Sequence, residues 1–350
     1  MLYKTNNPHG GDIYRENICI DFSVNINPFG APQSVKDAVC SAMDKINCYP
    51  DPYCRELVKK ISEAEGIPED FILCGNGAAE LIYSYFHAVR PKKAAECTPA
   101  FSEYSAALNN TGCRILRYNL PEDNDFELDE GVLDFLEHTR PEVFTLCNPN
   151  NPTGRLAEPS LMENILYLCK KNNTKLFVDE CFLDLTEKGV SMKGFLKDFP
   201  NLCILKAFTK TYGMAGIRLG YCMSGNEELL KRMSQTVQPW NVSVFAQKAG
   251  EAALEDPVFL EKSRKYILKE RMWLSEKLKE LGMRVCPSDA NFLLFYGEKD
   301  LDLRLKEQGI FVRNCSNYHG LGGGWFRIAV LLHEENEKLI NAMKSICEKR

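Results

Sequence analysis

Short apolar runs alternate with helical patterns between residues 71 and 223, and this alternation limits the possible folds more than any other feature of the chain. The runs cover residues 71–74, 142–147, 176–178, 202–205 and 219–223. Strands that alternate with helices favour a mostly parallel sheet with helices on both faces. We therefore predict an α/β fold in which these runs are buried strands.

Polar residues or glycine turns follow four of the runs, where each strand is expected to end. They are the turn 75–77 (GNG), Asn151 in the turn 148–154 (NPNNPTG), Asp179 and Lys210. The carboxyl ends of strands in such a sheet line one crevice, where ligands bind. We expect these four features to meet there.

The segment 207–220 (AFTKTYGMAGIRLG) carries a lysine, Lys210, and an arginine, Arg218. A lysine at the mouth of a sheet is desolvated, which favours the neutral amine that forms a Schiff base with an aldehyde. An arginine binds phosphate through two hydrogen bonds and keeps its charge. Together they suggest pyridoxal phosphate (PLP), although a solvated connection is the commoner role of so short a segment.

The other strand-end features each allow a binding role and a plain one. The turn 75–77 offers backbone N–H groups to an anion, but it lacks the third glycine of a dinucleotide fingerprint and a Walker lysine. Asp179 ends an apolar strand, where a buried carboxylate needs a partner such as a protonated heterocycle. Alternatively, the turn only connects strand to helix and Asp179 caps the next turn.

Composition excludes several classes of protein. The net charge of −5 and pI of 5.7 argue against a nucleic-acid partner. No apolar stretch approaches the length of a membrane span. The 15 cysteines are scattered without a Cys-x-x-Cys pair, which predicts free thiols in a reducing cytoplasm and no metal site.

We predict three parts along the chain. Residues 1–32 form an N-terminal arm, residues 33–240 a large domain and residues 241–350 a small domain. In the small domain, a long amphipathic helix is expected at 260–281 and a final helix at 334–348. Strands of a smaller sheet are expected at 291–295, 310–312 and 325–330.

The ordered set of motifs resembles the fold-type I PLP-dependent enzymes along nearly the whole chain. It consists of the turns 75–77 and 148–154, Tyr104, Asp179, Glu180, Thr209, Lys210, Arg218 and Arg327. Within that family the chain is similar to the histidinol-phosphate aminotransferase branch, and there to the L-threonine-O-3-phosphate decarboxylases of cobalamin synthesis. The segments 9–11 (HGG), 21–28 (DFSVNINP), 179–182 (DECF) and 313–317 (RNCSN), with 320–322 (GLG), carry this finer resemblance.

The resemblance implies a large PLP-binding domain with a smaller α+β domain, and it implies a role for each site residue. Lys210 would carry the cofactor, Asp179 would pair with its ring nitrogen, and Tyr104 would stack on its ring. Asn151 would bind the ring hydroxyl, and the cofactor phosphate would be held by Gly77, Ala78, Ala79, Thr209 and Arg218. Tyr49 would reach the cofactor phosphate of a neighbouring subunit, which implies a homodimer.

The resemblance also implies a small phosphorylated amino acid as substrate. Arg327 matches the arginine that binds the substrate carboxylate in aminotransferase relatives, and the candidates for binding the substrate phosphate are His9, Asn25, Arg313 and Ser316. Gly10, Gly11 and Asn151 are further residues expected to contact the substrate. The expected reaction is decarboxylation of O-phospho-L-threonine. Phe182 stands where aminotransferases of this branch usually have tyrosine, which favours the decarboxylase. The alternatives are a histidinol-phosphate or other amino-acid aminotransferase, and a non-catalytic α/β ligand-binding protein.

Overall fold

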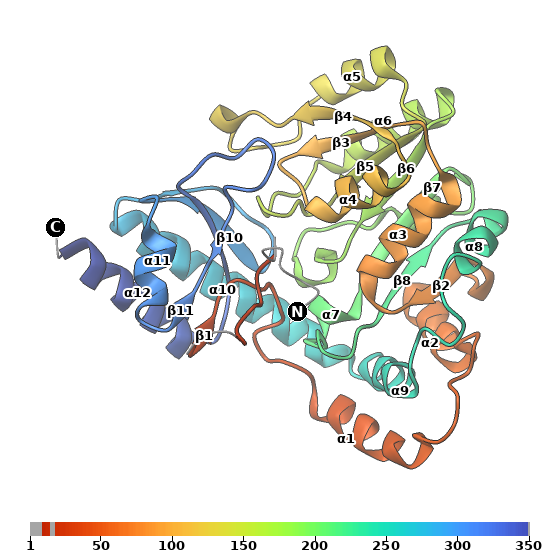
Figure 1. The fold of residues 1–350 in the computed structure, drawn as a ribbon, viewed down its shortest axis with the longest axis horizontal. Coiled ribbons are helices and arrows are strands. Elements are labelled where there is room, and N and C mark those ends of the chain that lie inside the picture. Colours follow the sequence, from red (N-terminus) through yellow and green to blue (C-terminus); the bar gives the residue numbers. More distant parts are fainter. Residues whose placement is uncertain (1–8, 15–17, 349–350) are drawn as a thin grey trace.

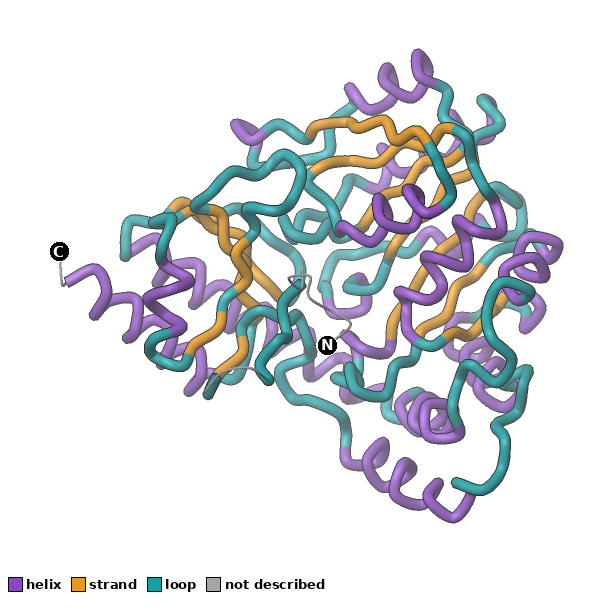
Figure 2. Tube along the Cα trace, viewed as in Figure 1, coloured by secondary structure: helices purple, strands orange, loops and turns teal. Residues whose placement is uncertain are grey.

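The structure, a computed structural model, describes residues 9–14 and 18–348. Two groups of strands lie on either side of a region of loops (Figures 1 and 2). The N-terminal residues that are described lie beside this region, and the long helix α10 (Pro257–Glu280) runs from it along the smaller group. Residues 1–8 and 15–17 of the predicted arm fall outside the described residues.

The larger group is a seven-stranded sheet in the part of the chain that is described, with the order β2-β8-β7-β6-β5-β3-β4. Only β8 runs against its neighbours, so the prediction of a mostly parallel sheet is confirmed. The strands are β2 (Ile72–Gly75), β3 (Lys93–Thr98), β4 (Arg114–Asn119), β5 (Val143–Cys147), β6 (Lys175–Asp179), β7 (Leu202–Ala207) and β8 (Gly220–Met223).

Successive side chains along each strand point to opposite faces of this sheet, and helices bury both faces. In β6, Leu176 and Val178 belong to one apolar cluster, whereas Phe177 between them belongs to another. Helices α2 (Arg55–Glu65), α5 (Gly131–Thr139) and α6 (Pro159–Lys171) cover the first face. Helices α3 (Gly77–Val89), α4 (Ser102–Asn110) and α8 (Glu227–Ser234) cover the second.

The smaller group is an antiparallel sheet with the order β12-β13-β10-β9. Its strands are β9 (Arg284–Val285), β10 (Phe292–Tyr296), β12 (Arg313–Asn314) and β13 (Trp325–Ala329). Helices α10, α11 (Leu301–Lys306) and α12 (His333–Glu348) flank it. The predicted strand at 310–312 is β11 (Ile310–Phe311), which pairs in parallel with β1 (Ile20–Asp21) of the arm and lies outside this sheet.

The arm is therefore built into the smaller part. Phe22 is fully buried in the apolar cluster of the small sheet, and its carbonyl accepts a hydrogen bond of 2.9 Å from the Ala329 amide. Helices α1 (Gln33–Ser41) and α9 (Val244–Ala253) pack against each other beside α2. The domain boundaries at residues 32 and 240 stay predictions.

Candidate active site

A cavity of about 330 Å³ lies at the carboxyl ends of β5, β6 and β7 and faces β12 and β13 of the small sheet. It is lined by most of the predicted site residues: His9, Gly10, Asn25, Ala78, Ala79, Tyr104, Asn151, Asp179, Thr209, Lys210, Arg218, Arg313 and Arg327. The structure thus brings together residues that are up to 318 positions apart, from His9 to Arg327.

Lys210 lies in the one-turn helix α7 (Phe208–Thr211), which continues directly from β7. The strand predicted at 202–205 extends to Ala207, and a helical turn then presents Lys210 to the cavity where a loop was expected. Burial lowers the pKa of Lys210 to about 8, and the positive charges of Arg327 and Arg218 act in the same direction. A sizeable fraction of its amine is therefore neutral, and hence nucleophilic, near neutral pH.

Asp179 is the last residue of β6 and is buried. Its Oδ2 accepts a hydrogen bond of 2.5 Å from the Tyr104 hydroxyl, and its Oδ1 accepts one of 2.9 Å from the Cys181 amide. Burial raises the pKa of Asp179 in spite of these bonds. A cationic partner in the cavity, such as a protonated pyridine nitrogen, would stabilise the ionised carboxylate.

The start of α3 and Arg218 form a cradle for an anion at one end of the cavity. The Asn76 side chain makes no capping hydrogen bond to the first turn of α3, so the backbone N–H groups of that turn remain for a ligand. The amide of Asn76 itself donates to Glu80 Oε2 at 2.7 Å. Gly77 has φ +81°, and a Cβ there would lie 2.7 Å from Arg218 Nη2. Arg218 itself has φ +63°, which a non-glycine residue seldom adopts. These features fit the PLP phosphate.

Arg313 and Arg327 lie directly opposite each other in the antiparallel pair of β12 and β13, and both face the cavity. Arg327 is buried. It donates one hydrogen bond to Asn151 Oδ1 and another, of 2.7 Å, to the Ser23 carbonyl. Arg313 donates a 2.7 Å hydrogen bond to Asn317 Oδ1, with its guanidinium over the Tyr318 ring. Two cations in this arrangement repel each other unless an anion lies nearby.

Four predicted site residues do not line the cavity. Gly77 lies behind Arg218, and Gly11 donates its amide to Ser23 Oγ at 2.8 Å. Ser316 is exposed outside it. Tyr49 is 78% exposed and stacks on Trp240 with 4.4 Å between ring centroids.

Several lining residues are absent from the sequence prediction of the site. Ser23, Tyr318 and Phe101 come from loops whose approach to the cavity depends on the tertiary fold. Cys147 ends β5 and Cys181 follows Asp179, so their position at strand ends was a usable signal. Phe182 also lines the cavity, with its ring packed edge-on against Phe292.

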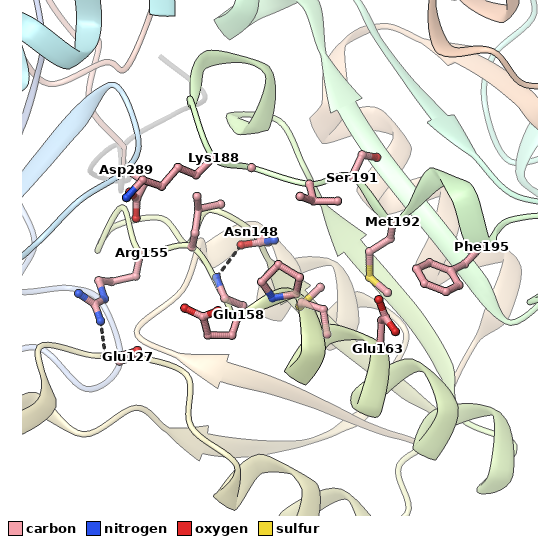
Figure 3. A pocket seen from close by; sticks show the side chains of 16 residues that line it. Glu127, Asn148, Arg155, Glu158, Glu163, Lys188, Ser191, Met192, Phe195 and Asp289 are labelled. Atoms are coloured by element: carbon pink, nitrogen blue, oxygen red, sulfur yellow. Dashed lines mark hydrogen bonds and ion pairs between the residues drawn. The ribbon is translucent and has the colours of Figure 1, made fainter.

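A second cavity, of about 320 Å³, lies beside the start of α6 (Figure 3). Arg155 forms an ion pair with Glu127 in its wall, and Asn148 Oδ1 accepts a 2.9 Å hydrogen bond from the Ala157 amide. None of the predicted site residues lines it.

The described residues include no cluster of three or more His, Cys, Asp or Glu side chains arranged to hold a metal ion. Across the same residues, no helix has the length and apolar character needed to traverse a bilayer.

The chain resembles known proteins along most of its length. Residues 17–343 match the family model described as aminotransferase class I and II. A threonine-phosphate decarboxylase of Salmonella typhimurium is 36% identical over 97% of each chain. A histidinol-phosphate aminotransferase of Caldanaerobacter subterraneus is 32% identical over 95% of this chain and 94% of its own. The crystal structure of the Clostridium acetobutylicum histidinol-phosphate aminotransferase superposes with a TM-score of 0.88 at 29% identity, covering 95% of this chain and all of the other.

Proposed function

The chain belongs to the class I and II aminotransferase family of PLP-dependent enzymes, and from that premise we propose that it decarboxylates O-phospho-L-threonine. The product would be (R)-1-aminopropan-2-yl phosphate, a precursor of the cobalamin nucleotide loop. Some relatives of this chain are named decarboxylases and others are named aminotransferases. The choice between the two reactions therefore depends on how the cavity would hold its substrate.

The balance of charge in the cavity carries the proposal. Arg218, Arg313 and Arg327 are cationic lining residues, and Asp179 is the lining carboxylate, so positive charge is in excess even without Lys210. Such an excess of partly buried positive charge favours ligands with several anionic groups. The cofactor phosphate at Arg218 supplies one anion. A substrate with both a carboxylate and a phosphate would supply the others.

Each residue then has a defined task. Lys210 would hold the cofactor, and its ammonium form would donate the proton that takes the place of CO₂ at the substrate Cα. Asp179, oriented by the Tyr104 hydroxyl, keeps the pyridine nitrogen protonated. Bound PLP supplies an electron sink for the pair left at Cα when a bond there breaks.

The substrate would be held at its two anionic ends. Arg327 presents a guanidinium already oriented by Asn151 and Ser23, which suits the carboxylate. Arg313, the cross-strand neighbour of Arg327, and His9 line the same cavity and suit the phosphate. Holding both ends would fix the orientation of the bonds at Cα, and therefore which of them breaks when the cofactor is bound. Phe182 has no hydroxyl to offer the cofactor ring, which separates this site from the tyrosine-bearing aminotransferases.

The test is product analysis with the cofactor-loaded protein and O-phospho-L-threonine. We expect release of CO₂ and formation of the phosphorylated amine in equal amounts, without a 2-oxo acid acceptor. Amino transfer to 2-oxoglutarate from histidinol phosphate, without CO₂ release, would replace the proposal with the aminotransferase. Absence of a cofactor absorbance band after PLP addition would favour a non-catalytic binding protein.

We further propose that the enzyme is a homodimer with shared active sites. Met43, Ile46, Tyr49 and Tyr53 are more than half exposed, and Trp240 is 46% exposed beside Tyr49. Exposed apolar side chains gathered on one short segment favour a protein contact. Tyr49 lies outside the cavity of its own chain, as expected of a residue that serves the neighbouring subunit.

Free cysteines throughout the chain support a reducing cytoplasm as its location.

A further inference from the structure

The first described residues of the arm are docked at two points beside the cavity. The ring of His9 reaches Glu103 in the first turn of α4, with 2.7 Å between His9 Nε2 and Glu103 Oε1. The next two residues lie on Ser23. A Cβ at Gly10 would be 2.5 Å from Ser23 Oγ, and the Gly11 amide donates to that oxygen. A side chain at residue 10 would push the arm away, so the position of His9 depends on both contacts.

Glu103 is held as a carboxylate from two sides. Besides contacting His9, it accepts a 2.9 Å hydrogen bond at Oε2 from the Tyr83 hydroxyl of α3. The hydrogen bond with His9, more than the one with Tyr83, lowers the pKa of Glu103. Burial and the nearby Glu103 raise the pKa of Tyr83 to about 12, so Tyr83 remains a hydroxyl donor. The amino end of α4 also favours a negative charge in its first turn.

Glu103 does not itself line the cavity, whereas residues on each side of it do. Phe101 and Tyr104 line it, and the Phe101 ring lies 5.6 Å from the His9 ring. Tyr104 contacts Asp179. A carboxylate so close to a cavity with excess positive charge would weaken the binding of an anionic substrate unless its oxygens are engaged elsewhere, and His9 and Tyr83 engage both of them.

We propose that Glu103 is a positioning residue that holds His9 over the cavity, where His9 contacts the phosphate of the substrate, and that Tyr83 orients the Glu103 carboxylate. The inference rests on the proposed function insofar as it needs a substrate that carries phosphate. It assigns to Glu103 and Tyr83 a part in selecting phosphorylated over unphosphorylated amino acids.

The test is a double-mutant cycle on the cofactor-loaded dimer with Glu103→Ala, His9→Ala and both together. We measure KM and kcat for O-phospho-L-threonine and the binding of the same compound by calorimetry. Glu103→Ala should raise KM about 1.5- to fivefold, as expected for one partly exposed charged contact, with kcat unchanged. In the His9→Ala background it should add little.

Two further variants separate positioning from simple structural support. Glu103→Gln keeps one oxygen that can accept from His9 but replaces the oxygen that accepts from Tyr83 by an NH₂ group, so it should restore part of the affinity that Glu103→Ala loses. Tyr83→Phe should produce a smaller increase in KM than Glu103→Ala. Glu228→Ala removes an exposed carboxylate from the first turn of α8 and should leave KM unchanged. The cofactor absorbance spectrum should be the same in all variants, because Glu103 acts on the substrate side.

The outcomes distinguish this inference from the proposed function. If the wild-type protein decarboxylates O-phospho-L-threonine and the Glu103 and His9 effects are additive, the positioning role is wrong and the function stands. A fall in kcat with an altered cofactor spectrum would likewise overturn it, because Glu103 would then act through Tyr104. If histidinol phosphate proves to be the substrate, the same cycle with it supports or overturns the role while the decarboxylase proposal falls. Failure to bind any phosphorylated amine overturns both.

Discussion

The opposed arginines of the small sheet give the most quantitative prediction, for the substitution Arg313→Met. Without substrate, the change removes the repulsion between Arg313 and Arg327, a cross-strand term of about 0.2–1 kcal/mol. It also removes the contact of Arg313 with the Tyr318 ring, worth about 0.5–1 kcal/mol at a partly exposed site. Loss of the hydrogen bond from Arg313 to Asn317 Oδ1 costs a further ~0.5–1.5 kcal/mol. Because the lost repulsion opposes these two losses, the free energy of unfolding should fall by no more than about 2 kcal/mol.

The affinity of the cofactor-loaded protein for its substrate should fall in the same variant. A hydrogen bond between charged groups contributes about 1.5–3 kcal/mol, so loss of one contact to the substrate phosphate should weaken binding about 10- to 150-fold. Calorimetric titration of the cofactor-loaded protein with O-phospho-L-threonine measures the affinity, and thermal unfolding without substrate measures stability. Arg114→Met, which removes an exposed cation from β4, is the matched control. Unchanged affinity in Arg313→Met would refute the assignment of the phosphate to this arginine.

Three other predictions concern the cofactor, pH and the dimer. Phe182→Tyr would add a hydroxyl beside the cofactor and with it a hydrogen bond worth about 0.5–1.5 kcal/mol. The absorbance of the bound cofactor should then titrate at a different pH, while CO₂ release should still exceed amino transfer. A switch to mainly amino transfer would show that the electronic state of the cofactor determines the reaction. For the cofactor-free protein, the contribution of Lys210 to the free energy of unfolding should rise as pH increases from about 8 to 10.5, because the unfolded chain then holds the Lys210 proton more tightly than the folded one. In denaturant titrations, the free energy of unfolding of the wild type relative to Lys210→Met should therefore increase over this pH range, and a constant difference would count against a desolvated amine. Tyr49→Ala should weaken cofactor retention without changing the fold, and analytical ultracentrifugation of the wild type should show a dimer; a fully active monomer would contradict the shared site.

The features predicted correctly from the sequence are those fixed by local pattern. An apolar run that ends in a polar residue marks both a buried strand and its position at the sheet edge, which is why Asp179 and Asn151 were placed correctly in the cavity. Lys210 was placed there too, but its helical turn was missed, because four residues are too few to show a helical period.

The features that were missed depend on contacts between distant segments. Strand β11 pairs with β1, some 290 positions earlier, and nothing in the apolar run at 310–312 identifies that partner. Strand β3 has no continuous apolar run because it contains Glu96, which is buried and bonded to Ser105 and Arg117. A buried carboxylate of this kind is visible only when its partners are in place.

The most direct test of the account is to identify the lysine that carries the cofactor. The chain offers a matched rival, because Lys206 is also buried, four residues before Lys210 on the same strand and turn. Lys206 donates to Glu65 at 3.0 Å and to Asp184 at 2.8 Å, and these carboxylates raise its pKa and keep it charged. The PLP-loaded protein should be reduced with borohydride, digested and mapped by mass spectrometry. We predict that the label is on Lys210; label on Lys206 or any other lysine would contradict the site described above.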